Sequence, residues 1–216
     1  MNTSFTAAAL AALALCNMAF ATGQNQPMPA SCPGGGGSSV LHDQLPGASP
    51  FAINSQNYGS PTDDNAAADD FVVPAGWTWK IKRVVVKGDY FSGAVPPSPP
   101  ADVTFYKDAG GVPGTVQCSY PAATSLPWGI QPNGNMEVQN LNCTLPAGHY
   151  FVSFVANMGF GSGQWGWRLQ PTQNFWPAVW ENPGGGFGNC TSWGDLASCL
   201  GQASPDLAFR LIGCAY

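Results

Sequence analysis

The chain has 216 residues, of which only 9% are Asp, Glu, Lys or Arg, and its formal net charge is −5. Binding to nucleic acid relies on clustered Lys and Arg that displace counterions from phosphates. Seven such residues scattered along an acidic chain exclude that class of partner, and the length fits a single domain.

The first segment, residues 1–21, is predicted to be a signal peptide. A short apolar run ends in Ala19-Phe20-Ala21, the small-x-small pattern of a cleavage site, although no Lys or Arg precedes it. The run is too short for a membrane span and no second long one follows. We therefore expect a secreted protein, extracellular or periplasmic, with no membrane span. Residues 22–39 are rich in Gln, Pro, Gly and Ser, which predicts a flexible leader before a domain over residues 40–216.

The segment PTDDNAAADDF carries two pairs of acids, Asp63-Asp64 and Asp69-Asp70. Calcium is bound by six to eight oxygens, often from carboxylates on an ordered loop, so these four residues are candidate ligands. The alternative, which we favour, is that they cap turns and accept hydrogen bonds from nearby backbone N–H groups. No motif requires a cofactor, and calcium is the only metal ion that the sequence suggests.

The apolar segments after the leader have the two-residue period of strands and not the period of helices. In residues 77–86, strict alternation would place Trp77, Trp79, Ile81 and Arg83 on one face of a strand and Val84 on the other. Asp108 to Gly114 is predicted to be a tight turn between two strands. With 27 Gly and 20 Pro between short strands, the chain is predicted to be all-β. Further strands are expected at residues 103–106, 116–120, 136–141, 149–156, 165–169 and 207–212.

Five of the eight tryptophans lie between residues 163 and 193. Trp165 and Trp167 are two residues apart, so on a strand they share a face, and at least one is expected in the core. Trp176, Trp180 and Trp193 lie in segments rich in Pro and Gly and are predicted to show a face to solvent, where clustered aromatic side chains usually mark a binding site. Nearby polar residues are candidates to contact the hydroxyl groups of a sugar; they are Arg168, Asn174, Glu181 and Asn182.

Six cysteines remain after the signal peptide, and an even number in an exported chain predicts disulfides. Several pairings are possible. We favour Cys118–Cys143 between neighbouring strands, Cys190–Cys199 closing a loop, and Cys32–Cys214 tying the termini.

Four segments resemble a family of bacterial secreted β-sandwich domains that occur alone or beside extracellular peptidases and in cell-surface proteins. This resemblance implies a jelly-roll-like fold and a non-catalytic role, and it carries no catalytic residues to transfer. The segments are AADDFVVPAGWTWKI (67–81), DVTFYKDAGGVPG (102–114), LPAGHYFVSFVANM (145–158) and PDLAFRLIG (205–213).

Catalytic motifs are scarce. The chain has two histidines and two glutamates, no G-x-S-x-G elbow and no H-E-x-x-H. The predicted protein is therefore a single antiparallel β-sandwich, jelly-roll-like and held by disulfides, that is not an enzyme. Our first hypothesis is a module that binds extracellular carbohydrate or a cell-surface polymer through exposed tryptophans. The second is a structural or adhesive protein of the envelope or matrix with no small ligand, and a hydrolase is a distant third.

Overall fold

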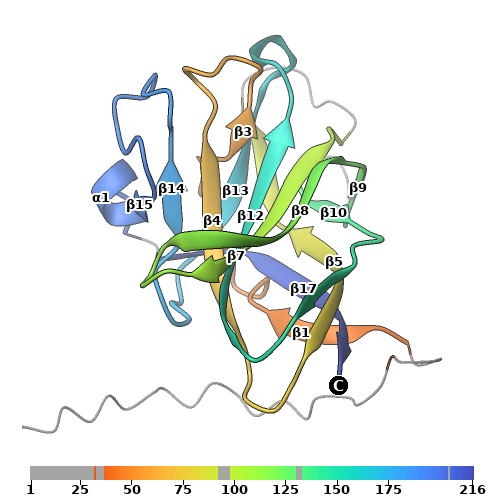
Figure 1. Cartoon of the computed structure of the whole chain (residues 1–216). Coiled ribbons are helices and arrows are strands. Elements are labelled where there is room, and N and C mark those ends of the chain that lie inside the picture. The colour runs from red at the N-terminus through yellow and green to blue at the C-terminus, as the bar shows by residue number, and fades with distance from the viewer. Residues whose placement is uncertain (1–31, 33–36, 92–97, 130–132, 204) are drawn as a thin grey trace, which may run out of the picture.

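The computed structural model describes residues 32, 37–91, 98–129, 133–203 and 205–216 (Figure 1). The predicted signal peptide and most of the leader lie outside the described residues. The elements are β1 (Ser39–Asp43), β2 (Ala52–Asn54), β3 (Gln56–Asn57), β4 (Ala66–Val73), β5 (Trp79–Val86), β6 (Gly88–Phe91), β7 (Ala101–Asp108), β8 (Pro113–Ala123), β9 (Ser125–Pro127), β10 (Met136–Val138), β11 (Cys143–Leu145), β12 (Gly148–Asn157), η1 (Phe160–Ser162), β13 (Gln164–Gln170), β14 (Val179–Glu181), β15 (Gly194–Asp195), α1 (Leu196–Leu200), β16 (Asp206–Leu207) and β17 (Phe209–Ala215).

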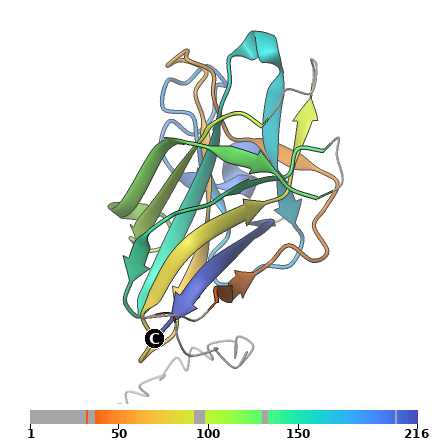
Figure 2. The same cartoon turned by 90° about the vertical axis from the view of Figure 1, so that its right-hand side faces the viewer.

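The strands form two packed layers. One layer is a seven-stranded sheet in the order β15-β14-β4-β12-β7-β8, with β3 pairing β12. The other is a six-stranded sheet in the order β1-β17-β5-β10-β9, with β11 pairing β5. A four-stranded sheet of β16-β13-β2 and β6 continues this second layer, because β5 leads directly into β6 and β16 into β17. Figure 2 shows β5 (yellow) and β17 (dark blue) running side by side.

Between the described residues, every strand pair is antiparallel except β3 with β12. Sequence neighbours such as β4 and β5 lie in different layers, so the chain crosses between layers as in a jelly roll. The predicted antiparallel, jelly-roll-like sandwich is confirmed.

The core lies between the layers and follows the two-residue alternation of the strands. Tyr150, Val152 and Phe154 of β12 face inward and are at most 1% exposed. Trp165 and Trp167 of β13 are both fully buried, so both side chains pack into the core, not just one of them. Large aromatic side chains supply much of the buried area of a small sandwich, which explains why the chain contains so many.

Strand β5 departs from the predicted alternation at a β-bulge. Its register with β17 pairs Ile212 with Arg83 and Gly213 with Ile81, so Lys82 is an extra residue. A bulge of one residue reverses the faces of everything that follows. Val84 therefore packs in the core and Arg83 is on the outer face, the reverse of the assignment that strict alternation gives.

The three disulfides are those favoured from the sequence: Cys32–Cys214, Cys118–Cys143 and Cys190–Cys199. The loop closed by the last contains most of the short helix α1, which begins where the Asp195 side chain accepts the Ser198 N–H at 2.9 Å. Within the described ranges, no helix is long and apolar enough to cross a membrane.

Candidate binding site

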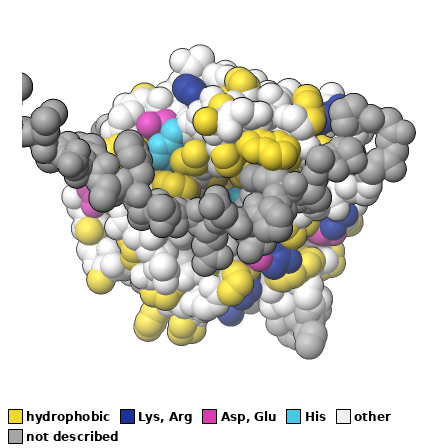
Figure 3. All heavy atoms as spheres, turned by 90° about the horizontal axis from the view of Figure 1, so that it is seen from below, with side chains coloured by type: hydrophobic (Ala, Val, Ile, Leu, Met, Phe, Trp, Pro, Cys, Tyr) yellow, Lys and Arg dark blue, Asp and Glu magenta, His cyan; other side chains and the backbone are white. Residues whose placement is uncertain are grey.

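Aromatic side chains from four parts of the chain meet on the outer face of the seven-stranded sheet, and we call this group the aromatic strip. Side chains on alternate positions of β7 and β12 point outward, away from the core, and two loops add rings beside them. A view from below shows hydrophobic side chains beside a histidine and acidic side chains (Figure 3). The strip consists of Tyr106, His149, Phe151, Phe175, Trp176 and Trp193.

Trp176 is the most prominent ring of the strip, with 44% of its surface exposed. Its backbone N–H donates to Asp70 Oδ2 at 2.9 Å, which fixes the loop between β13 and β14 to β4. The indole also lies against the turn between β7 and β8, where a Cβ added to Gly111 would be 3.4 Å from the ring. Phe175, 47% exposed, is adjacent. Trp176 is thus fixed by a hydrogen bond of its backbone and by contact with the β7–β8 turn, and the Phe175 ring meets the His149 ring edge to face.

His149 joins the loop rings to the sheet. Its ring is nearly parallel to those of Phe151 and Trp176, with interplanar angles of 9° and 12° and centroid distances of 6.3 and 6.5 Å. Its Nε2 contacts Asp70 Oδ2, and its Nδ1 lies 3.7 Å from Asp108 Oδ2. Burial raises the pKa of Asp70, whereas its hydrogen bonds with His149 and the Trp176 N–H lower that pKa.

The far end of the strip is formed by Trp193 and Tyr106, whose rings meet edge to face at a centroid distance of 6.2 Å. Both pack against a small apolar cluster that includes Phe151 and Val179. Burial raises the pKa of Glu181 to about 6. Burial also raises the pKa of Tyr106, and the nearby negative charge of Glu181 raises it further. Glu181 thus supplies a carboxyl group beside this end of the strip.

A second group of carboxyls lies behind the strip. Asp69 and Asp206 are both fully buried. Asp69 accepts hydrogen bonds from Gln44 Nε2 at 2.5 Å and from the Leu207 N–H at 2.7 Å. Burial raises the pKa of Asp206 to about 8, and it raises the pKa of Asp69 well above the usual range, with the neighbouring Asp206 and Asp70 adding to the shift. These acids support the fold beneath the strip and do not face solvent.

Two of the residues predicted to contact a ligand are in the interior instead. Trp180 is 1% exposed, because β14 pairs with β4 in a register that turns its indole into the core, where Nε1 donates to Asn54 O at 2.9 Å. Asn182 is fully buried and donates to the backbone oxygens of Thr62 and Asp64. Neither residue can touch a ligand at the surface, and both predictions are wrong.

Arg168 and Asn174 also have other partners. The Arg168 guanidinium binds both oxygens of Asp89 at 2.7 Å, and it lies on β13, in the layer opposite the aromatic strip. The backbone N–H of Asn174 donates to Asp206 Oδ2 at 2.5 Å, and its side chain lies 3.4 Å from Gln44 Oε1. Arg168 is therefore excluded from the strip, while Asn174 fixes the loop that carries Trp176.

The four aspartates predicted as calcium ligands are not brought together. Asp64 Oδ1 accepts the Tyr58 N–H at 2.7 Å, and Asp63 accepts the Ser60 hydroxyl at 3.0 Å, so these two organise a turn as the favoured alternative predicted. Asp69 and Asp70 are consecutive on β4 and point to opposite faces. Among the described residues, no three His, Cys, Asp or Glu side chains are grouped so that they could hold a metal ion.

Of the predicted ligand contacts, Trp176, Trp193 and Glu181 remain at the strip. The sequence did not single out the other members, Tyr106, His149, Phe151 and Phe175. The alternation of His149 and Phe151 showed that they share a face, but not that this face meets the loop of Trp176, because that contact joins residues far apart in the chain.

No protein-family model, curated protein or solved structure matches this chain. The function is therefore inferred from the residues of the strip themselves.

Proposed function

We propose that this protein binds an extracellular carbohydrate or cell-surface polymer through the aromatic strip and does not act as an enzyme. The observation that carries the proposal is Trp176, whose indole is 44% exposed although its backbone and ring are fixed by Asp70, His149 and Gly111. A large ring held rigidly in water gains little from folding, and such exposed apolar surface commonly marks a binding site.

The chemistry of the strip suits a sugar. One side of a pyranose ring is lined by C–H groups that pack on a flat aromatic face, and its hydroxyls donate to carboxylates at the edge. Trp176 and Phe175 supply the apolar surface, while Asp108 and Glu181 supply carboxylates from β7 and β14. Ligand sites in general combine an apolar wall with a few placed polar groups.

A binding role is favoured over catalysis by the surroundings of His149. In the described part of the chain, its ring contacts carboxylates and aromatic rings, with no hydroxyl or thiol nucleophile beside it. A histidine that acts as a general base in nucleophilic catalysis needs such a partner within hydrogen-bonding distance. The three disulfides support the proposal that the protein works outside the reducing cytosol.

The test compares three alanine variants on an array of neutral and acidic glycans. Trp176→Ala should lower the affinity for the bound glycan by about tenfold or more, as for other central aromatic contacts, and its free energy of unfolding should fall by only about 1 kcal/mol. Trp180→Ala should instead lose about 3–5 kcal/mol of stability, because its indole is in the core.

Phe160→Ala is the matched control, since Phe160 is 66% exposed but lies on η1, away from the strip. It should bind glycan as the unaltered protein does. Equal binding by Trp176→Ala and the unaltered protein, or no binding to any glycan, would count against the strip as a carbohydrate site and favour a structural or adhesive role.

A further inference from the structure

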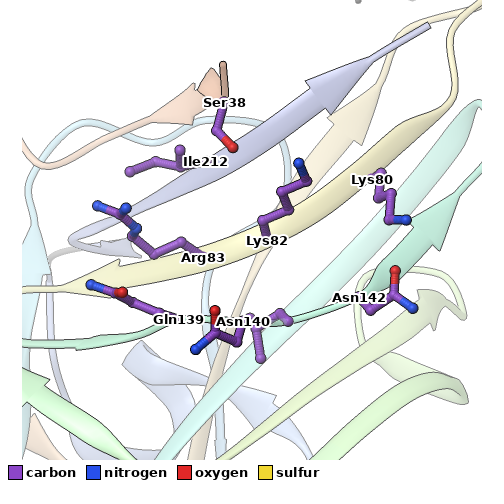
Figure 4. Close-up of a pocket in the computed structure, with 9 residues that line it drawn as sticks. Ser38, Lys80, Lys82, Arg83, Gln139, Asn140, Asn142 and Ile212 are labelled. Carbon is purple, nitrogen blue, oxygen red and sulfur yellow. The ribbon is translucent and has the colours of Figure 1, made fainter. Parts of the chain in front are cut away.

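A second surface feature lies in the opposite layer of the sandwich, on the outer side of β5. It is an open hollow of about 410 Å³ that is lined mainly by cationic and amide side chains. Figure 4 shows the cations along β5 and the amides along the neighbouring segment. The side chains that matter here are Lys80, Lys82, Arg83, Gln139, Asn140 and Asn142.

The bulge in β5 creates the cationic wall. Lys80 is on the outer face by simple alternation with the buried Trp79 and Ile81. The extra residue, Lys82, shifts the alternation so that Arg83 also reaches the outer face, and all three cations line the same hollow. Without the bulge, Arg83 would point into the core. Bulges commonly re-aim side chains in this way beside functional sites.

The amide wall arises because strand pairing is interrupted on the side of β5 away from β17. Strands β10 and β11 pair with β5 on either side of residues 139–142, which bow away from it. Only the Leu141 N–H returns to β5, where it donates to Lys82 O at 3.0 Å. Asn140 has φ of 60°, a left-handed conformation that Asn tolerates better than most residues, and it turns the chain at this point. Both edges of the hollow are therefore built by the backbone.

The charge of the hollow contrasts with that of the whole chain. Three of the seven Lys and Arg residues line it, although the net charge of the protein is −5. Arg83 is partly neutralised by Glu137, at 3.5 Å, and Gln139 also binds that carboxylate. Lys80 makes no ion pair with any described residue, and Lys82 Nζ has only a weak contact with Cys32 Sγ at 3.7 Å. In the described part of the chain, these two ammonium groups thus have no carboxylate partner.

We propose that this hollow binds an oxyanion-bearing sugar, a carboxylate or sulfate group on an acidic polysaccharide. The ammonium groups of Lys80 and Lys82 donate to the oxyanion, and such charge-assisted hydrogen bonds are stronger than neutral ones. The side-chain amides of Gln139, Asn140 and Asn142 both donate and accept, which suits the hydroxyls on the same sugar ring. Two or three cations are too few for a nucleic-acid backbone, which is bound through many phosphate contacts.

The test is calorimetric titration of the full protein with four short probes. A galacturonate disaccharide carries carboxylates, a sulfated galactose disaccharide carries sulfate, an unsubstituted galactose disaccharide is neutral, and a short single-stranded DNA is the competing class of ligand. We expect at least one acidic disaccharide to bind in a way that depends on Lys80 and Lys82, and we expect no such dependence for the neutral disaccharide or the DNA. Binding should weaken as salt is added, because exposed charges are screened beyond about 8 Å at physiological ionic strength.

Variants then locate the site. The double variant K80Q/K82Q removes two charges but keeps the apolar stems, and it should weaken binding by about a hundredfold, or about tenfold for each charged hydrogen bond. K107Q is the matched control, because Lys107 is an exposed lysine on the other layer. Neither K107Q nor Trp176→Ala should change the affinity, which separates this site from the aromatic strip.

The proposal is wrong if neither acidic disaccharide binds, if K80Q/K82Q weakens binding of the neutral sugar or the DNA as much as that of the acidic one, or if K80Q/K82Q keeps the full affinity for the acidic disaccharide. The acidic disaccharide that binds identifies the anionic group.

Discussion

The surroundings of the Asp206 side chain disfavour its ionised form. It is fully buried, its Oδ2 accepts the Asn174 N–H at 2.5 Å, and its Oδ1 has no hydrogen-bond partner in the described structure. Asp69 and Asp70 are close enough that each carboxylate disfavours ionisation of a neighbour. A pKa of about 8 means that Asp206 is mostly protonated at neutral pH, which limits the cost of burying it.

Replacing Asp206 with Asn should therefore change how stability depends on pH. The folded state keeps the Asp206 proton up to about pH 8, whereas the unfolded chain loses it near pH 4, so the free energy of unfolding falls as the pH rises between these values. The contribution of protonated Asp206 is complete below about pH 4 and is lost as the pH passes about 8.

D206N lacks this group but keeps an oxygen that can accept the Asn174 N–H. We expect the fall in stability between about pH 4 and about pH 8 to be smaller in D206N, by on the order of a few kcal/mol. Urea denaturation across this range measures the slope. An identical slope in both proteins would mean that Asp206 titrates alike in the folded and unfolded chains, contrary to this prediction.

Trp176 and Trp180 show how far single residues can be predicted from the sequence. They lie four positions apart in one segment between prolines, and composition alone suggested that both face solvent. Trp180 is buried because β14 is a strand with alternating faces that pairs with β4, and Trp176 is exposed because it precedes that strand. The deciding interaction is between residues more than a hundred positions apart, so local composition did not reveal it.

At the level of elements, the position of the strands followed from their periodicity but the faces of β5 did not. Each expected segment contains a strand, because alternation reports directly on a sheet with one buried face. The strand expected over residues 136–141 is too long, since β10 ends at Val138 and the chain then leaves the sheet. The bulge at Lys82 depends on how β17 fits against β5, which no pattern within residues 77–86 records. The sequence thus predicted the sandwich but not the cationic hollow that the bulge creates.

Gly213 allows the bulge, and its replacement by Ala should destabilise the protein. A Cβ at Gly213 would lie 2.1 Å from Lys80 O, a backbone atom that cannot move without breaking the pairing of β5 with β17. We expect a loss of about 1–3 kcal/mol, as for other forced overpacking, with weaker binding in the hollow. Gly161→Ala is the control, since a Cβ there would have no atom within 4 Å. Denaturation of both variants tests this, and equal stability would contradict it.

At the level of the whole molecule, the three disulfides close loops of very different length. Cys190–Cys199 spans 9 residues, Cys118–Cys143 spans 25, and Cys32–Cys214 spans 182 and joins the segment before the domain to the last strand, β17. A cross-link restricts the unfolded chain more strongly when the loop it closes is longer. The Cys32–Cys214 bridge should therefore contribute the most to stability.

We expect the free energy of unfolding to fall when each bridge is removed in turn by replacing both of its cysteines with alanine. The loss should be larger the longer the loop that the bridge closes. The loop-closure model gives about 2.5 kcal/mol for Cys190–Cys199, about 3.5 for Cys118–Cys143 and about 5 for Cys32–Cys214. Urea denaturation of the three variants measures the losses. Each variant removes two sulfur atoms and one S–S bond, so each is a control for the others in composition. If the loss for Cys190–Cys199 is the largest, local packing of α1 against β14 outweighs loop closure, and the ranking by loop length is wrong.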